Sequence, residues 1–123
     1  MKANELRVGN YIEYFYPHEQ EWGIHDVSIE DFEDVEKEYF RPIPLTEEWL
    51  LKFGFTSNGW LYEKTATNGV KYLWYYNTFG YFREDLNSRK ANPIAYLANT
   101  EYIHQLQNLY FCLTGEELEI KKG

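Results

Sequence analysis

The feature that most constrains the fold is an Asn68–Gly69 pair between two aromatic-rich segments. Such a pair is a strong signal for a hairpin turn. The flanking residues, 59–64 and 70–77, have the composition of strands, and residues 80–85 offer a third strand. Residues 59–82 hold nine of the chain's 24 aromatic side chains. This region therefore predicts an antiparallel sheet that carries bulky rings.

Shorter strands are expected towards both ends of the chain. Residues 5–16 predict one or two strands, with an interruption at Gly9, and residues 24–29 offer a return strand. Residues 94–97 and 116–120 predict two further short strands.

Two segments predict helices with clear ends. Thr46 is placed to cap a short helix, and Gly54 is placed to end it in a left-handed conformation. Residues 102–113 repeat apolar side chains with helical period, with Thr100 as the expected cap and Gly115 as the end.

These elements together predict an α+β fold. A small, mostly antiparallel sheet would pack against the C-terminal amphipathic helix, with two shorter helices beside it. The chain of 123 residues shows no internal repeat and no linker, so we expect one domain over residues 1–123.

The net charge of −8 restricts the expected partners. Binding to a nucleic-acid backbone needs a stripe of Lys and Arg, so direct backbone binding is not expected. An acidic surface suits a basic protein partner, and it also keeps a small domain in solution without any further role.

The cysteine count and the hydropathy pattern indicate a compartment. Cys112 is the only cysteine, which excludes an intrachain disulfide and suits a reducing environment. The N-terminal residues lack an apolar stretch of signal-peptide length, and no window reaches the ~18 apolar residues that a membrane span needs. We therefore expect a cytoplasmic protein with no membrane partner.

The sequence contains no recognisable catalytic or cofactor motif. His18, His25, His104 and Cys112 lack the spacing of metal ligands, so we expect surface or hydrogen-bonded histidines and a small core cysteine. The acidic residues lack the glycine of a calcium loop. No nucleophile elbow, phosphate loop or dinucleotide fingerprint occurs. We expect no enzymatic activity, no metal and no cofactor.

Residues 28–40 predict an acidic helix that is the first candidate binding element. Ser28 is placed as an N-cap with Asp31 three residues later, and the apolar stripe comprises Ile29, Phe32, Val35 and Tyr39. The acidic candidates are Glu30, Asp31, Glu33, Asp34 and Glu36. The helix dipole accounts only for acids in the first turn. The later acids form either a solvated face or a surface that attracts a basic partner.

The aromatic hairpin is the second candidate. Strict alternation would place Tyr72, Trp74 and Tyr76 on one face of the sheet and Tyr75 on the other. One face must cover the core, and the other either packs against a second element or forms a sticky surface. The exposed members of Trp60, Tyr72, Trp74, Tyr75 and Tyr76 would then anchor a partner.

Three segments carry a family resemblance: NELRVGNYIEY, LTEEWLLKFGF and YIHQLQNLYFCLTGEELEI. They resemble a group of small uncharacterised proteins carried by phages, prophages and mobile elements of gut Bacteroidetes. Residues 56–98 do not carry the resemblance. It implies an accessory protein that acts inside a bacterial host cell, and it assigns no activity and no functional residues.

The leading hypothesis is a non-enzymatic phage or mobile-element protein that binds a host protein. A basic, nucleic-acid-binding defence effector is the expected partner, which would make the protein an anti-defence inhibitor of the anti-CRISPR type. Two alternatives stay open. One is a small-molecule binder that sequesters a nucleotide-like signal, and the other is a structural protein that forms homo-oligomers.

Overall fold

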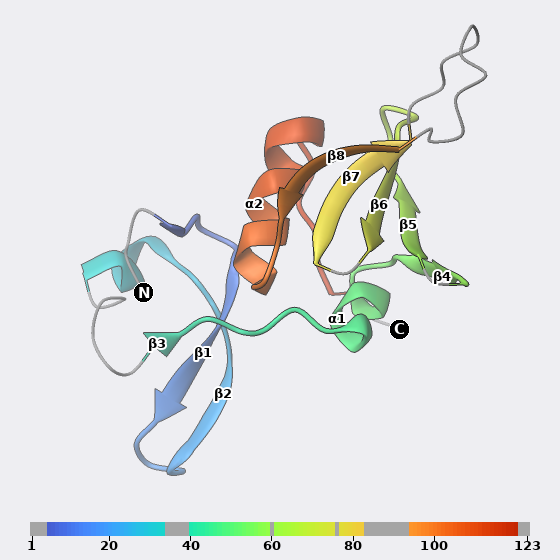
Figure 1. The fold of residues 1–123 in the computed structure, drawn as a ribbon. Helices are drawn as coiled ribbons and strands as arrows, with labels where there is room; N and C mark the ends of the chain where they lie inside the picture. The colour runs from blue at the N-terminus through green and yellow to red at the C-terminus, as the bar shows by residue number, and fades with distance from the viewer. Residues whose placement is uncertain (1–4, 34–39, 60, 76, 83–93, 121–123) are drawn as a thin grey trace, which may run out of the picture. The chain divides into compact units, whose positions relative to one another are not determined.

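The computed structural model describes residues 5–33, 40–59, 61–75, 77–82 and 94–120. Within these residues the chain forms eight β-strands, two α-helices and short 3₁₀ segments (Figure 1). The chain divides into two compact units. The first unit comprises Met1–Leu45 and Glu101–Glu117, and the second comprises Thr46–Thr100 and Leu118–Gly123. Each unit is thus built from two separate stretches of sequence.

The first unit contains a three-stranded antiparallel sheet in the order β2-β1-β3. Its strands are β1 (Tyr11–Tyr16), β2 (Glu21–Asp26) and β3 (Phe40–Arg41). Gly9 has a φ of +96°, in the left-handed region that glycine enters without a steric penalty. The interruption predicted at Gly9 is therefore confirmed. The return strand is present as β2, but it begins three residues earlier than the predicted residues 24–29 and ends at Asp26.

The acidic segment begins as the 3₁₀ helix η2 (Ile29–Glu33). Residues 34–39 lie outside the described residues, and Phe40 belongs to β3, so the predicted helix over residues 28–40 is wrong at its C-terminal end. Ile29 is 78% exposed, which contradicts its place in the apolar stripe, whereas Phe32 packs against the core. Val35 and Tyr39, the other two members of the predicted stripe, lie outside the described residues.

The C-terminal helix α2 (Ile103–Thr114) also belongs to the first unit. Its start is capped by Gln105, whose Oε1 accepts hydrogen bonds from the Glu101 and Tyr102 N–H groups at 2.8 and 3.1 Å. The prediction that Thr100 caps this helix is therefore wrong. Gly115 ends the helix with a φ of +74°, as predicted.

Two groups of side chains form the interior of the first unit. One is the cluster of Leu6, Ile12, Val27 and Phe40, with Tyr14 and Phe32 against it. The other lies on the buried side of α2 and includes Ile103, Leu106 and Tyr110. Leu113 was expected in the same stripe but is 40% exposed.

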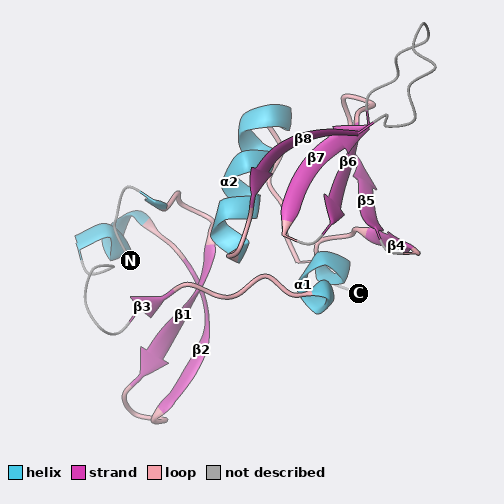
Figure 2. Ribbon diagram, viewed as in Figure 1, coloured by secondary structure: helices cyan, strands magenta, loops and turns pink. Residues whose placement is uncertain are grey.

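The second unit is built around a five-stranded antiparallel sheet in the order β4-β5-β6-β7-β8 (Figure 2). The strands are β4 (Thr56–Asn58), β5 (Leu61–Thr65), β6 (Lys71–Tyr75), β7 (Thr78–Phe82) and β8 (Ile94–Asn99). Asn68 and Gly69 lie in the turn between β5 and β6, and Gly69 has a φ of +84°. The predicted hairpin is confirmed, as is the strand expected at residues 94–97. Of the strand expected at residues 80–85, residues 80–82 belong to β7 and residues 83–85 lie outside the described residues.

The short helix α1 (Glu47–Lys52) lies in the same unit, and both of its predicted ends are confirmed. Thr46 Oγ1 accepts a hydrogen bond from the Trp49 N–H at 3.4 Å, and Gly54 has a φ of +93°. Trp49, Leu50 and Phe53 are buried, which supplies the tertiary packing that a helix of six residues needs.

The fold class is α+β, as predicted, with antiparallel sheets and a C-terminal helix. The strands form two sheets where one was expected. Residues 116–120 do not form the predicted final strand. Here the Glu116 N–H donates to Thr114 Oγ1, and the Glu117 side chain pairs with Arg7. No helix in the described part of the chain could span a membrane.

Candidate functional site

Two of the predicted aromatic anchors are buried in the second unit. Tyr72 and Trp74 lie on β6, in the middle of the five-stranded sheet, and are 4% and 8% exposed. The Tyr72 ring stacks on Phe79 with the ring centroids 5.5 Å apart. Trp74 Nε1 donates a hydrogen bond to Thr100 Oγ1 at 3.1 Å. Neither side chain is therefore among the exposed aromatic residues that the binding hypothesis requires.

Of the three remaining aromatic candidates, the structure describes only Tyr75. Tyr75 ends β6 and is half-buried. Trp60 and Tyr76 lie outside the described residues, and so do the acidic candidates Asp34 and Glu36. Their part in binding stays a prediction.

Among the acidic candidates, Glu30 is exposed, Glu33 is the last residue of η2, and Asp31 is held in a specific set of hydrogen bonds. Asp31 Oδ2 accepts from the Ser28 N–H at 2.7 Å and from Ser28 Oγ at 3.0 Å, and it lies 2.9 Å from His25 Nε2 on β2. Desolvation opposes ionisation of Asp31, but these hydrogen bonds outweigh it and lower the pKa of the carboxyl group. Asp31 therefore ties η2 to β2, while Glu30 faces solvent.

The face of the first sheet that points away from its core carries an apolar patch. We call this side the outer face; it displays Glu13, Phe15, Trp22, Ile24 and Arg41, whereas Ile12, Tyr14, His25 and Phe40 lie on the inner face. The Phe15 and Trp22 rings lie 5.5 Å apart, and Ile24 is 49% exposed. This face combines aromatic rings, an aliphatic side chain and two charges on regular strands.

The outer face is held in place by Arg41. Its guanidinium lies 3.9 Å from the centre of the Trp22 ring, and its Nη2 lies 2.6 Å from Glu13 Oε2. A cation above the ring face restricts the Trp22 side chain without covering Ile24. This patch was not predicted from the sequence, although the alternation of Glu13 with Phe15 and of Trp22 with Ile24 is the pattern of one strand face.

Four exposed carboxylates surround β2, and we call them the acidic rim: Glu19, Glu21, Asp26 and Glu30. Glu21 and Asp26 are the two ends of β2, Glu19 lies in the turn before it, and Glu30 lies in η2. In the part of the chain that the structure describes, none of the four forms an ion pair. The rim therefore creates a negative potential beside the apolar patch, and no ion pair among the described residues reduces it.

The charge of the chain is divided unequally between the two units. The first unit contains 14 acidic and four basic residues, a net charge of −10. The second contains six acidic and eight basic residues, a net charge of +2. The two arginines among the described residues of the first unit, Arg7 and Arg41, are already paired with Glu117 and Glu13. The negative potential therefore originates in the unit that carries the outer face.

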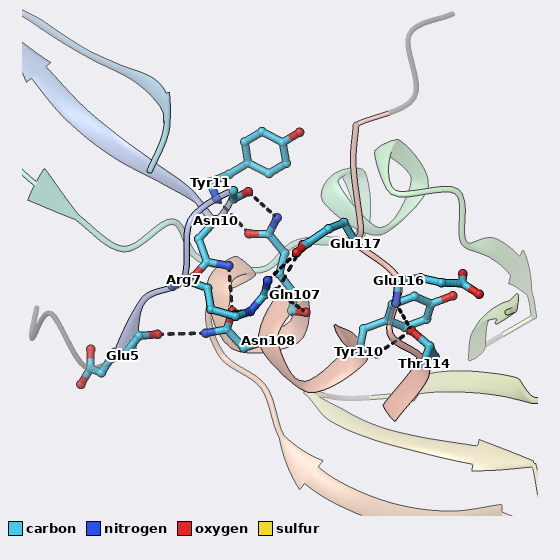
Figure 3. Close-up of polar contacts among 11 residues, drawn as sticks. Glu5, Arg7, Asn10, Tyr11, Gln107, Asn108, Tyr110, Thr114, Glu116 and Glu117 are labelled. Carbon is cyan, nitrogen blue, oxygen red and sulfur yellow. Dashed lines mark hydrogen bonds and ion pairs between the residues drawn. The ribbon is translucent and has the colours of Figure 1, made fainter. Parts of the chain in front are cut away.

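A buried polar network fixes β1 on α2 in the same unit (Figure 3). Gln107 is fully buried; its Oε1 accepts from the Tyr11 N–H at 2.8 Å and its Nε2 donates to the Gly9 carbonyl at 3.2 Å. Asn108 Oδ1 accepts from Asn10 Nδ2 at 2.8 Å and from Arg7 Nε at 3.0 Å. Satisfied buried polar groups of this kind specify one arrangement of the elements that they join. The network positions β1, and β1 in turn positions β2.

The remaining titratable groups do not assemble into a metal site. No group of three or more His, Cys, Asp or Glu side chains suited to a metal occurs among the described residues. Cys112 is exposed on α2, so the expectation of a small core residue is wrong. His18 is exposed and His25 is hydrogen-bonded, as expected, but His104 is buried. Burial lowers the pKa of His104, and the nearby Glu5 carboxylate opposes that shift.

No protein-family model, curated protein or solved structure matches this chain. The chemistry of its own surface is therefore the basis for the function proposed below.

Proposed function

We propose that this protein is a non-enzymatic binding protein that docks its first unit onto a basic surface of another protein. The acidic rim would attract the partner, and the outer face would supply the apolar contact. The observation that carries the proposal is the charge division, with −10 in the first unit and +2 in the second. Because both units belong to one chain, a need for solubility alone does not explain why the charge gathers in one of them.

The rim and the outer face have complementary roles in such docking. Long-range attraction between opposite charges raises the association rate, by 10- to 1,000-fold in steered complexes, and is screened by salt. Buried aromatic and aliphatic anchors instead slow dissociation. Trp22 and Ile24 are the anchors that the outer face offers, in place of the buried Tyr72 and Trp74.

The family resemblance of residues 4–14, 45–55 and 102–120 supports a bacterial host protein as the partner. Accessory proteins of phages and mobile elements often act by binding host proteins. A nuclease-type defence effector has the basic surface that the rim requires, because it must itself bind nucleic acid. On this proposal the protein is an anti-defence inhibitor of the anti-CRISPR type.

The test begins with affinity capture from the natural host, followed by association rates of the captured partner measured at two salt concentrations. The double variant Glu21→Lys with Glu30→Lys should slow association at least tenfold, about 1.4 kcal/mol or more, and should flatten its salt dependence. The matched control is Glu48→Lys with Glu119→Lys, which makes the same charge change at exposed positions of the second unit.

The two variants separate a local attraction from a general effect of net charge. Equal rates for both variants and the unmodified protein would defeat the proposal, and so would equal slowing by both variants. A thermal shift with a nucleotide, in the absence of any captured protein, would favour the small-molecule alternative. Growth of the scattering mass with concentration would favour the homo-oligomer.

A further inference from the structure

The strand β2 has a free edge within the described residues. It lies at the end of the three-stranded sheet, with β1 on one side and no strand on the other. An edge strand exposes backbone N–H and C=O groups that can pair with another chain. Proteins that bind extended peptides commonly do so by adding the peptide to such an edge.

The hydrogen bonds next to β2 show which of its backbone groups face that edge. The Val27 N–H donates to the Asn10 carbonyl at 2.9 Å, and the Gly9 N–H donates to the Val27 carbonyl at 2.9 Å. Val27 therefore directs both groups towards the β1 side. In an antiparallel pair the direction alternates from residue to residue. The backbone groups of Trp22, Ile24 and Asp26 consequently face away from β1.

The same three residues also point their side chains to the outer face, because they alternate with Glu21, Gly23 and His25. Trp22 is held by Arg41, and Ile24 is half exposed. Residues of an added antiparallel strand that lie directly opposite Trp22 and Ile24 would share the outer face with them. Apolar side chains suit those positions.

The inner face of β2 favours a different kind of side chain in the added strand. Glu21 is exposed at one end, and Asp31 lies against His25 at the other. Between them the Tyr16 ring covers Gly23 so closely that an added Cβ would lie 2.7 Å from Tyr16 Cε2. A carboxylate and an aromatic ring both attract a Lys or Arg side chain. Positively charged residues suit the inner-face positions of the added strand.

A second copy of β2 is a poor occupant of this edge. An antiparallel pair of two β2 strands would bring the four carboxylates of the acidic rim close to the same four carboxylates of the other copy. Like charges brought together in this way repel one another and destabilise the pair. The acidic ends of β2 thus disfavour self-association and favour a basic strand, which is how edge strands are commonly protected.

We propose that β2 binds an extended segment of the partner protein as an added antiparallel strand. Its apolar residues would lie over Trp22 and Ile24, and alternate Lys or Arg residues would lie over Glu21 and the Tyr16 ring. This proposal rests on the proposed function, because it names the surface and the chemistry of the partner for the same docking.

The test uses a capped nine-residue peptide of alternating valine and lysine, labelled with a fluorophore, and measures its binding by fluorescence anisotropy. The valines should lie opposite Trp22 and Ile24 and should direct their N–H groups to β2. N-methylation of the valines should therefore weaken binding at least tenfold, and N-methylation of the lysines should change it less than threefold. A peptide of alternating valine and glutamate should not bind.

Other outcomes overturn the inference in distinct ways. Absence of binding by the valine–lysine peptide would overturn the free edge as a site. Equal binding of all the N-methylated forms would show that charge attraction acts without strand pairing. If only N-methylation of the lysines abolished binding, the antiparallel pairing would be overturned. A parallel strand with its valines opposite Trp22 and Ile24 directs the N–H groups of the lysines to β2 instead.

Variants of the protein provide a second reading. Ile24→Pro removes an N–H that faces the free edge and leaves the bonds to β1, so it should weaken peptide binding at least tenfold. Ile24→Ala keeps that N–H and should lose less affinity. Equal affinities of the two variants would count against edge pairing, and if Ile24→Pro fails to fold, the N-methylated peptides carry the test alone.

The peptide experiment also separates this inference from the proposed function. Charge reversal in the rim could reduce capture of a host protein that the peptide does not displace. That result would support the proposed function and overturn the inference that β2 binds an added strand. Selective peptide binding with no charge-dependent host partner would support the edge and count against the proposed function.

Discussion

Gln107→Leu should lower the free energy of unfolding of the first unit by about 2–5 kcal/mol. Gln107 is fully buried on α2 and bonds two backbone groups, the Tyr11 N–H and the Gly9 carbonyl (Figure 3). Leucine has a similar volume, but it offers neither a donor nor an acceptor. The substitution therefore removes both hydrogen bonds without opening a large cavity.

The magnitude follows from the two groups that lose this partner. A buried donor or acceptor left without its hydrogen bond costs about 1–3 kcal/mol, and the apolar transfer of leucine offsets a part of the sum for two groups. A domain is typically stable by about 5–15 kcal/mol, so the expected loss is a large share of the whole. The loss should be concentrated where β1 meets α2.

Residue-resolved hydrogen exchange is the suitable assay, because two compact units need not unfold in one step. The Tyr11 amide and the amides of β1 and α2 should lose protection in Gln107→Leu. The control is Cys112→Ala, an exposed position on the same helix, where the change should stay within about 0.5 kcal/mol. A similarly small change in Gln107→Leu, with the Tyr11 amide protected as before, would refute the reasoning.

Two further predictions concern pH. The lowered pKa of Asp31 means that its ionised form stabilises the fold at pH values above the unfolded pKa of about 3.9, and that this stabilisation is lost as the pH falls further. In urea denaturation, Asp31→Asn should therefore lower the free energy of unfolding by about 1–2 kcal/mol at pH 7 and by less at pH 3. Burial also lowers the pKa of His104, so the unfolded chain takes up a proton near pH 6.5 before the folded chain does, and stability falls by up to about 1.4 kcal/mol per pH unit below that value. His104→Gln should show a smaller loss between pH 7 and 5.5, and an unchanged pH slope would contradict this assignment.

Local signals in the sequence predicted the local structure well. Thr46, Gly54, Asn68, Gly69 and Gly115 all have the roles expected of them. Each role depends on the backbone conformation of one residue or on a partner within a few positions. Such features are decided within one turn, so they can be predicted without knowledge of the tertiary fold.

Features that depend on distant partners were predicted less well. Thr100 has a side chain that often caps helices, yet its hydroxyl accepts a hydrogen bond from Trp74, 26 residues earlier in the chain. Gln105 caps α2 instead. Cys112 lies within an apolar stripe in sequence but on the exposed side of the helix. Competition for one hydroxyl group, and the choice of the buried helix face, are settled only by tertiary packing.

The position of each hairpin in its sheet distinguishes the buried rings of β6 from the exposed side chains of β2. Both hairpins place rings at alternating positions, and sequence alone favoured the richer one, around Tyr72 and Trp74, as the binding surface. That hairpin contributes β6, which has a neighbouring strand on each side, and its Tyr72 and Trp74 rings are buried in the core. The hairpin of β1 and β2 ends at an edge, where Ile24 stays half exposed and acidic residues stand at both ends of the strand. Among the described residues, aromatic density therefore did not identify the exposed surface, whereas the position of β2 at a sheet edge leaves Ile24 and the acidic rim accessible to the partner that we propose.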